Sequence, residues 1–247
     1  MPEAHLNVKM LSVTPDALKV IYSACRQCYS PEFAGDIFQS SSNQDKISEF
    51  VKKVFSSGHE SPLEHVKFTF AVEGISRVCT HQLVRHRIAS FSQQSQRYVR
   101  EEKFDYIMPP AFKDNPELKN IFEEAMSKIQ QSYNKIQAYF KGEGKSAESI
   151  NQDARFLLPG ACETKIVVTM NARELVHFFK IRLCMRAQWE IRSLAHKMLD
   201  LCREELPAIF EGVDAKCVFL GYCPEGEKFS CGRYPIKKKF IGGIKNG

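Results

Sequence analysis

The 247-residue sequence lacks any apolar run that approaches the roughly 20 residues of a membrane-spanning helix. Its first residues, MPEAHLNVKM, lack the basic stretch and apolar core of a secretory signal. It also lacks internal repeats, low-complexity segments and long polar linkers. These absences predict a cytoplasmic protein with no membrane partner, organised as a single domain over residues 1–247. The lysine-containing tail, from about residue 233 to 247, is expected to be flexible.

The common local signatures of nucleotide binding and hydrolysis are also missing. Neither G-x-G-x-x-G nor G-x-x-x-x-G-K-[ST] occurs, and no G-x-S-x-G elbow accompanies the serines near His81 and His86. A bound nucleotide would therefore be held by side chains. The net charge of +6 favours an anionic partner, but it is too small to choose among nucleotides, nucleic acids and phosphorylated substrates.

The nine cysteines form no recognisable framework. Nine is an odd number in a chain too long for a disulfide scaffold, so reduced thiols are expected. Cys25 and Cys28 form a C-x-x-C at the end of a predicted helix, where cysteines are usually small core residues. Cys217, Cys223 and Cys231 could join them as zinc ligands. Their irregular spacing argues against this, and no metal is expected.

Hydrophobic periodicity predicts interleaved helices and strands. One helix follows Thr14, the expected cap, and another covers residues 44–57. Alternation in HVKFTFAVE and TKIVVTM predicts half-buried strands. The spacing in ISRVCTHQLVRHR predicts a helix that ends near Arg85. The expected fold class is α+β, with a mixed or mostly antiparallel sheet covered by helices.

Two further helices are predicted in the second half of the chain. The longest, residues 116–141, has the apolar stripe Ile121, Phe122, Ala125, Ile129, Tyr133, Ile136 and Phe140. A later helix follows a capping box in which Asn171 is the cap and Glu174 lies three residues on. It is expected to carry His177 and to place Arg182 and Arg186 one turn apart on the same side.

Residues 85–98, RHRIASFSQQSQRY, are rich in hydrogen-bond donors and contain no acidic residue. They are expected to form an irregular segment between packed elements. A solvated basic face is one explanation of such a cluster. An anion site is the other, because several of these arginines border apolar stretches and need anionic partners there. The candidate arginines are Arg85, Arg87, Arg97, Arg155, Arg182 and Arg186.

Two other classes of function stay open on the residues alone. One is a nucleic-acid-binding module, with Phe91 and Tyr98 as the aromatic residues among the basic ones. The other is a metal hydrolase that uses His59, His65, His81 and His86. The segment HESPLEH differs from H-E-x-x-H because its histidines are six apart with a proline between them, so a turn is expected there.

The segment RHRIASFSQQSQR resembles the signature of flavin-dependent thymidylate synthases, R-H-R, seven residues, S, one residue, R, at every defined position. GHESPLEH, QDARFLLP and NARELVHFFKIRLCMRAQWEIR resemble further segments of that family, in the same order. The resemblance implies methylation of dUMP to dTMP with FAD as cofactor, and with NADPH and 5,10-methylenetetrahydrofolate as co-substrates. It also implies an α+β fold, a homotetramer whose subunits share active sites, and no nucleic-acid partner.

The resemblance implies roles for individual residues. Arg182 is expected to be catalytic by polarising the uracil without a cysteine nucleophile, and Arg97 and Arg155 are expected near the phosphate. The dUMP set is Gln82, Arg85, Gln93, Gln94, Ser95, Gln96, Arg97, Arg155 and Arg182. The FAD set is His59, Ser61, Glu64, Arg85, His86, Arg87, Ile88, Ser90, Gln93, Asn171, His177, Ile181 and Arg186.

Four positions depart from residues that are frequent in this family. Ser92 and Gln93 stand where members often carry an Asn-Glu pair. His177 and Arg186 stand where other members have asparagine and histidine. All four retain hydrogen bonding, but Gln93 removes a negative charge.

Overall fold

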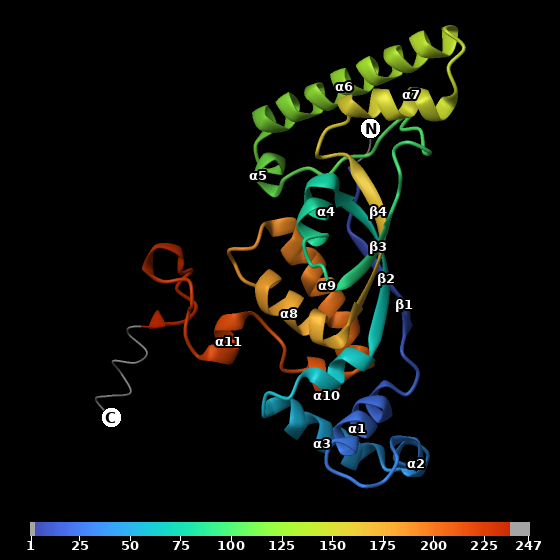
Figure 1. Ribbon diagram of the computed structural model, residues 1–247. Coiled ribbons are helices and arrows are strands. Elements are labelled where there is room, and N and C mark those ends of the chain that lie inside the picture. Colours follow the sequence, from blue (N-terminus) through green and yellow to red (C-terminus); the bar gives the residue numbers. More distant parts are fainter. Residues whose placement is uncertain (1–2, 238–247) are drawn as a thin grey trace. The chain divides into compact units, whose positions relative to one another are not determined.

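The computed structural model of the protein describes residues 3–237 (Figure 1). These residues combine helices with a four-stranded antiparallel sheet of order β1-β2-β4-β3. The strands are β1 (Asn7–Val13), β2 (Lys67–Ser76), β3 (Ala89–Gln93) and β4 (Glu163–Asn171). The predicted α+β class with an antiparallel sheet is confirmed. The end of the lysine-containing tail, residues 238–247, lies outside the described residues.

The described chain divides into two compact units. Unit 1 comprises residues 3–9, 71–85 and 91–168, and unit 2 comprises residues 10–70, 86–90 and 169–237. Each of the four strands has some of its residues in unit 1 and the others in unit 2. The organisation as a single domain over residues 1–247 stays a prediction.

Unit 2 contains the predicted strand HVKFTFAVE up to Phe70, and the alternation there places Val66, Phe68 and Phe70 in its core. The ring of Phe68 packs edge-on against Phe210 at 5.6 Å between centroids. Its helices are α1 (Ala17–Gln27), α2 (Ala34–Ser40), α3 (Gln44–Ser56), α8 (Ala172–Arg182), α9 (Trp189–Glu205), α10 (Pro207–Phe210) and α11 (Lys216–Leu220), with 3-10 turns η1 (Ser61–His65) and η3 (Glu227–Phe229).

Unit 1 contains α4 (Arg77–Leu83), α5 (Pro110–Lys113), α6 (Pro116–Gly142), α7 (Ala147–Ala154) and the 3-10 turn η2 (Arg155–Leu157). One of its cores is formed by Phe104, Tyr106, Met108, Met126 and Cys162. None of the helices within residues 3–237 combines the length and apolar composition that a membrane span requires.

Two predicted helix starts were wrong, because one of the residues concerned is hydrogen-bonded to β2 and the others belong to β2. The hydroxyl of Thr14 accepts a hydrogen bond from the backbone N–H of Lys67 at 2.9 Å, and α1 begins after Asp16 instead. β2 continues through Ser76, whose hydroxyl then accepts from the N–H of Cys79 at 3.0 Å and caps α4. The helix predicted over ISRVCTHQLVRHR is therefore confined to α4.

The predicted stripe of α6 is also partly wrong. Its buried residues are Met126, Gln130, Tyr133 and Gln137, whereas Ile121 is 58% exposed. Glutamines occupy the buried face because they have partners: the side-chain oxygen of Gln130, for example, accepts from the N–H of Phe104 at 2.7 Å. Hydrophobic periodicity could not detect a face built partly from satisfied amides.

Candidate active site

The basic segment 85–97 is more regular than predicted. The segment begins in the turn that follows α4, and residues 89–93 form β3. The prediction of an irregular segment was therefore wrong for residues 89–93. Arg85 and Arg87 are exposed, whereas His86 between them is only 7% exposed. Residues 86–90 belong to unit 2, and Arg85 and residues 91–97 belong to unit 1.

A cavity of about 370 Å³ in unit 2, here called the α8 cavity, lies along the first turns of α8. Four residues of the predicted FAD set line it: Glu64, Ile88, Asn171 and His177. They come from three segments that are far apart in the sequence, so folding brings together residues that the family resemblance had selected separately. The other lining residues, Glu60, Arg173 and Glu174, were missed, although HESPLEH and NARELVH contain them.

Ion pairs connect the segment 59–65 to α8. Arg173 pairs with Glu64, and its Nε lies 3.9 Å from a carboxylate oxygen of Glu60. Nζ of Lys180 lies 2.8 Å from the other oxygen of Glu60. Two acidic side chains of the α8 cavity, Glu60 and Glu64, are therefore paired with basic side chains of α8.

HESPLEH forms the expected turn, η1, with His59, Ser61 and His65 exposed. Within residues 3–237, no three His, Cys, Asp or Glu side chains are grouped so that they could hold a metal ion.

The predicted N-cap of α8 is confirmed. The side-chain oxygen of Asn171 accepts from the N–H of Glu174 at 2.8 Å. The carboxylate of Glu174 is 3.1 Å from Nδ1 of His86, at the buried side of the cavity wall. The other nitrogen of His86, Nε2, accepts from Nε–H of Arg182 at 3.1 Å. Glu174, His86 and Arg182 thus form a continuous hydrogen-bonded row.

Burial sets the protonation of this row. Burial, Arg182 and His177 together lower the pKa of His86 to about 4, so its ring is neutral at neutral pH. Burial also raises the pKa of Glu174 above its ordinary value, and His177 partly offsets that effect. Arg182 is half-buried at the last residue of α8.

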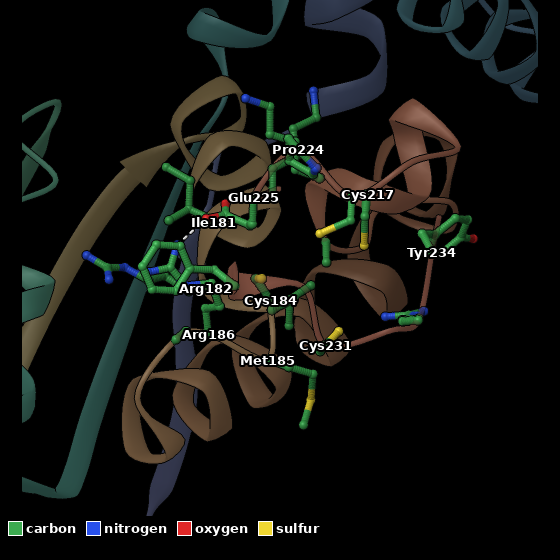
Figure 2. Close-up of a pocket in the computed structure, with 18 residues that line it drawn as sticks. Ile181, Arg182, Cys184, Met185, Arg186, Cys217, Pro224, Glu225, Cys231 and Tyr234 are labelled. Atoms are coloured by element: carbon green, nitrogen blue, oxygen red, sulfur yellow. Dashed lines mark hydrogen bonds and ion pairs between the residues drawn. The ribbon is translucent and has the colours of Figure 1, made fainter. Parts of the chain in front are cut away.

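A second cavity of unit 2, about 310 Å³, lies beyond the end of α8 (Figure 2). Ile181, Arg182 and Arg186 line it together with Cys184, Cys217, Cys223 and Cys231. The prediction that Arg186 lies on the same helix as Arg182 was wrong, because α8 ends at Arg182 and Arg186 follows in a turn. Both side chains nevertheless reach the same cavity.

Residues near the C-terminus engage Arg186. Its guanidinium forms an ion pair with Glu225 and lies 4.3 Å from the ring centroid of Phe229. All nine cysteines are free thiols, as predicted. Cys25 is buried as expected, but Cys28 is exposed, so its assignment to the core was wrong.

Unit 1 contains every predicted dUMP residue except Arg182. Gln93, at the end of β3, donates through Nε2 to the hydroxyls of Thr80 at 3.1 Å and Thr164 at 3.2 Å. Gln96 is buried and donates to the sulfur of Cys162 at 3.7 Å. Gln82 is half-buried in α4.

The turn after β3 is held by α7. The hydroxyl of Ser95 accepts from the N–H of Arg97 at 3.2 Å, and the carbonyl of Arg97 accepts from Nδ2 of Asn151 at 3.0 Å. The guanidinium of Arg97 pairs with Glu148. Gln94 lines a separate cavity of about 380 Å³ in unit 1.

Comparison with known proteins decides the family. Residues 9–208 match the family model described as thymidylate synthase complementing protein. The chain belongs to the flavin-dependent thymidylate synthase family. It is 52% identical over 242 residues to a flavin-dependent thymidylate synthase of Nitratidesulfovibrio vulgaris, a match that covers 96% of this chain and 99% of that protein. The enzyme of that name from Clostridium tetani is 48% identical over 246 residues, covering 95% and 96%.

A solved structure shares the fold of this family member. It is the UMP/dUMP methylase PolB from Streptomyces cacaoi bound with 5-Br dUMP, with a TM-score of 0.71 and 21% identity. The match covers 85% of this chain and 94% of that one.

The α8 cavity fits part of the flavin cofactor of this family. Asn171 and His177 offer polar side chains, and the N-terminal end of α8 favours negative charge. A volume of about 370 Å³ is near the lower end of pockets for drug-sized ligands, and a dinucleotide such as FAD is larger. Of the remaining FAD residues of unit 2, His86 is buried, and the others are exposed: His59, Ser61, Arg87, Ser90, Ile181 and Arg186.

Proposed function

We propose that this protein is a flavin-dependent thymidylate synthase that methylates dUMP to dTMP. Its co-substrates are 5,10-methylenetetrahydrofolate, which provides the carbon, and NADPH, which provides the reducing equivalents. The observation that carries the proposal is the α8 cavity, because residues expected at the flavin meet there from three separate segments. Membership of the family supports the same activity.

Asn171, His177 and Ile88 would hold FAD at the α8 cavity, and Arg87 would approach it from the exposed side. When bound, the flavin supplies the hydride-transfer chemistry. The protein contributes orientation: ion pairs of Glu60 and Glu64 with α8 fix the segment that carries them.

Arg182 would act on the pyrimidine. Its guanidinium stays cationic at working pH, so it can stabilise negative charge on the uracil oxygens without proton transfer. No cysteine nucleophile is then needed. In support, burial raises the pKa of Cys25 to about 11 and of Cys162 to about 12, and it also raises the pKa of Cys202 and Cys217. Thiols with raised pKa values are poor nucleophiles because the thiolate is the reactive form.

Arg97 and Arg155 would bind the phosphate of dUMP. Arg97 pairs with a carboxylate, Glu148, at a half-exposed position, which supports a role for its guanidinium in binding an anionic group. Gln93 and Gln96 are held by threonine and cysteine side chains, so they would present an ordered polar surface to the nucleotide.

A homotetramer with shared active sites completes the proposal. One chain offers a cavity smaller than FAD and leaves large apolar side chains exposed near the expected sites, among them Ile88 at 67%, Tyr98 at 67% and Phe156 at 86%. Partner subunits would cover such residues and supply the missing contacts. A cytoplasmic location fits an enzyme that uses NADPH and folate.

The test is the visible absorption spectrum of purified protein, incubated with FAD, desalted, and recorded before and after anaerobic NADPH. Retained flavin bands that bleach with NADPH, followed by dTMP formation that requires both dUMP and methylenetetrahydrofolate, are expected. A folded protein that retains no flavin would overturn the proposal. Affinity for nucleic acid that falls steeply with salt, or activity lost to chelators, would then favour the other two classes.

A further inference from the structure

His86 lies along one face of α8. Glu174, Phe178 and Arg182 are spaced four residues apart on that helix, so their side chains share a face. The imidazole spans all three: one nitrogen meets Glu174, the ring packs edge-on against Phe178 at 4.9 Å between centroids, and the other nitrogen meets Arg182. Both polar contacts are 3.1 Å long.

The chemistry of the donors fixes the tautomer of His86. Nε of arginine can only donate, so Nε2 of His86 must be the acceptor and carries no proton. In the neutral ring Nδ1 then carries the proton and donates to the carboxylate of Glu174. A protonated Nε2 would face the Nε–H of Arg182 with a second hydrogen and break that contact.

The row is anchored at its far end. The side-chain oxygen of Asn171 accepts a hydrogen bond from the backbone N–H of Glu174, and Glu174 as a whole is only 6% exposed. The other groups that face His86 are Phe178 and the ring of His177, 6.2 Å away between centroids. Arg182, by contrast, is half-buried at the end of the helix, where a long side chain has many rotamers to lose.

We propose that Glu174 is a positioning residue that acts through His86 to fix the orientation of the Arg182 guanidinium at the pyrimidine. The inference rests on the proposed function, in which Arg182 polarises the uracil. A guanidinium is planar, so a hydrogen bond at Nε fixes the plane in which its remaining N–H groups lie. Since both ring nitrogens of His86 are engaged, that histidine serves as a spacer between Glu174 and Arg182 rather than as a proton donor to the substrate.

The test compares Glu174→Ala and Glu174→Gln in the flavin-loaded protein. The glutamine oxygen can still accept from Nδ1–H of His86, so Glu174→Gln should keep kcat within about threefold of wild type. Glu174→Ala leaves His86 without its anchor and should lower kcat by about 10- to 100-fold, because misplaced catalytic groups cost rates of that order. Because Glu174 also lines the α8 cavity, kcat is measured at saturating FAD, and in Glu174→Ala the rate of flavin reduction by NADPH should fall less than kcat, which separates positioning of Arg182 from damage to the flavin site.

A double-mutant cycle checks the route through Arg182. Methionine has no N–H to give to His86, so Glu174→Ala should cause no further fall in kcat when it is added to Arg182→Met. If Arg182→Met has no turnover, the same cycle is measured on the Kd for dUMP by calorimetry. If the two substitutions act independently, so that the double variant loses the product of the two single effects, the proposal is overturned. A Glu174→Ala enzyme with wild-type kcat would also overturn it.

Controls distinguish this inference from the proposed function. Glu211→Gln removes another carboxylate of unit 2, the surface partner of Lys52, and should leave kcat unchanged. Wild-type protein that retains no flavin and forms no dTMP would refute the proposed function itself. Active wild type with an equally active Glu174→Ala would refute only the role of Glu174.

Discussion

Nε of Arg182 donates a hydrogen bond to Nε2 of His86 at 3.1 Å, across 96 residues of sequence. The contact joins the basic segment to the end of α8 within unit 2. It requires a neutral histidine, and burial beside two other potentially cationic side chains keeps His86 neutral. The histidine of the R-H-R signature is thereby linked to the arginine proposed to act on the substrate.

Replacement of that arginine gives the most direct prediction. Arg182→Ala should lower kcat for dTMP formation by at least about 100-fold, because removal of one preorganised donor at developing charge costs rates of that order. Flavin retained after desalting should stay near the wild-type amount. Arg100→Ala, which removes an exposed arginine paired with Glu102, is the control and should keep full activity. Wild-type turnover in Arg182→Ala would refute the role of this residue.

Stability should depend on pH through His86. Its pKa is about 4 in the folded protein and near 6.5 when unfolded, so between pH 6.5 and 4 the unfolded state takes up a proton that the folded state does not. The free energy of unfolding should therefore fall as the pH drops from 7 to 5, by at most roughly 2 kcal/mol from this group. The raised pKa of Glu174 acts in the opposite direction.

Urea denaturation at pH 7 and pH 5 measures this effect. The loss of stability should be smaller in His86→Gln than in wild type, whereas His196→Gln, at an exposed position on α9, should lose as much as wild type. An equal loss in wild type and His86→Gln would show that His86 titrates normally.

Asn171 should combine two roles that substitutions can separate. Asn171→Ala removes the cap of α8 and should lower the free energy of unfolding by about 1 kcal/mol. It should also reduce retained flavin, because Asn171 lines the α8 cavity. Asn115→Ala removes the equivalent cap of α6 and should cost similar stability with no loss of flavin. Asn171→Ser, which can still cap, should recover the stability but not the flavin.

Gln93 is explained by its partners. The hydroxyl hydrogen of Thr80 is donated to the carbonyl of Arg77 at 2.9 Å, so Thr80 must accept from Gln93. A glutamate at this position would offer no donor to Thr80 or Thr164. Gln93→Glu should therefore lower the free energy of unfolding by about 1 to 2 kcal/mol.

Thermal or urea denaturation tests this prediction. Gln131→Glu, at an exposed position of α6, is the matched control and should change stability by less than about 0.5 kcal/mol. A Gln93→Glu protein as stable as wild type would mean that the threonine hydroxyls can rearrange.

Local chemistry made much of the fold predictable. The alternation around Phe68 and Phe70 and the cap at Asn171 depend on neighbours in sequence, and both are confirmed. The start of α4 was missed because whether β2 or α4 takes Ile75 and Ser76 depends on pairing with distant strands. The buried face of α6 was missed because its glutamines are satisfied by residues far along the chain.

For the candidate site, the sequence by itself determined the family motif and the residue types, because both are properties of order and composition. Only the tertiary structure decided that Glu64, Ile88, Asn171 and His177 line one cavity, and that Glu174 faces His86. From the sequence alone, Glu174 was expected only to take part in the capping box at the start of α8. Its carboxylate meets a ring 88 residues away because the fold buries both groups at one face of α8, and such long-range pairing follows from packing rather than from local spacing.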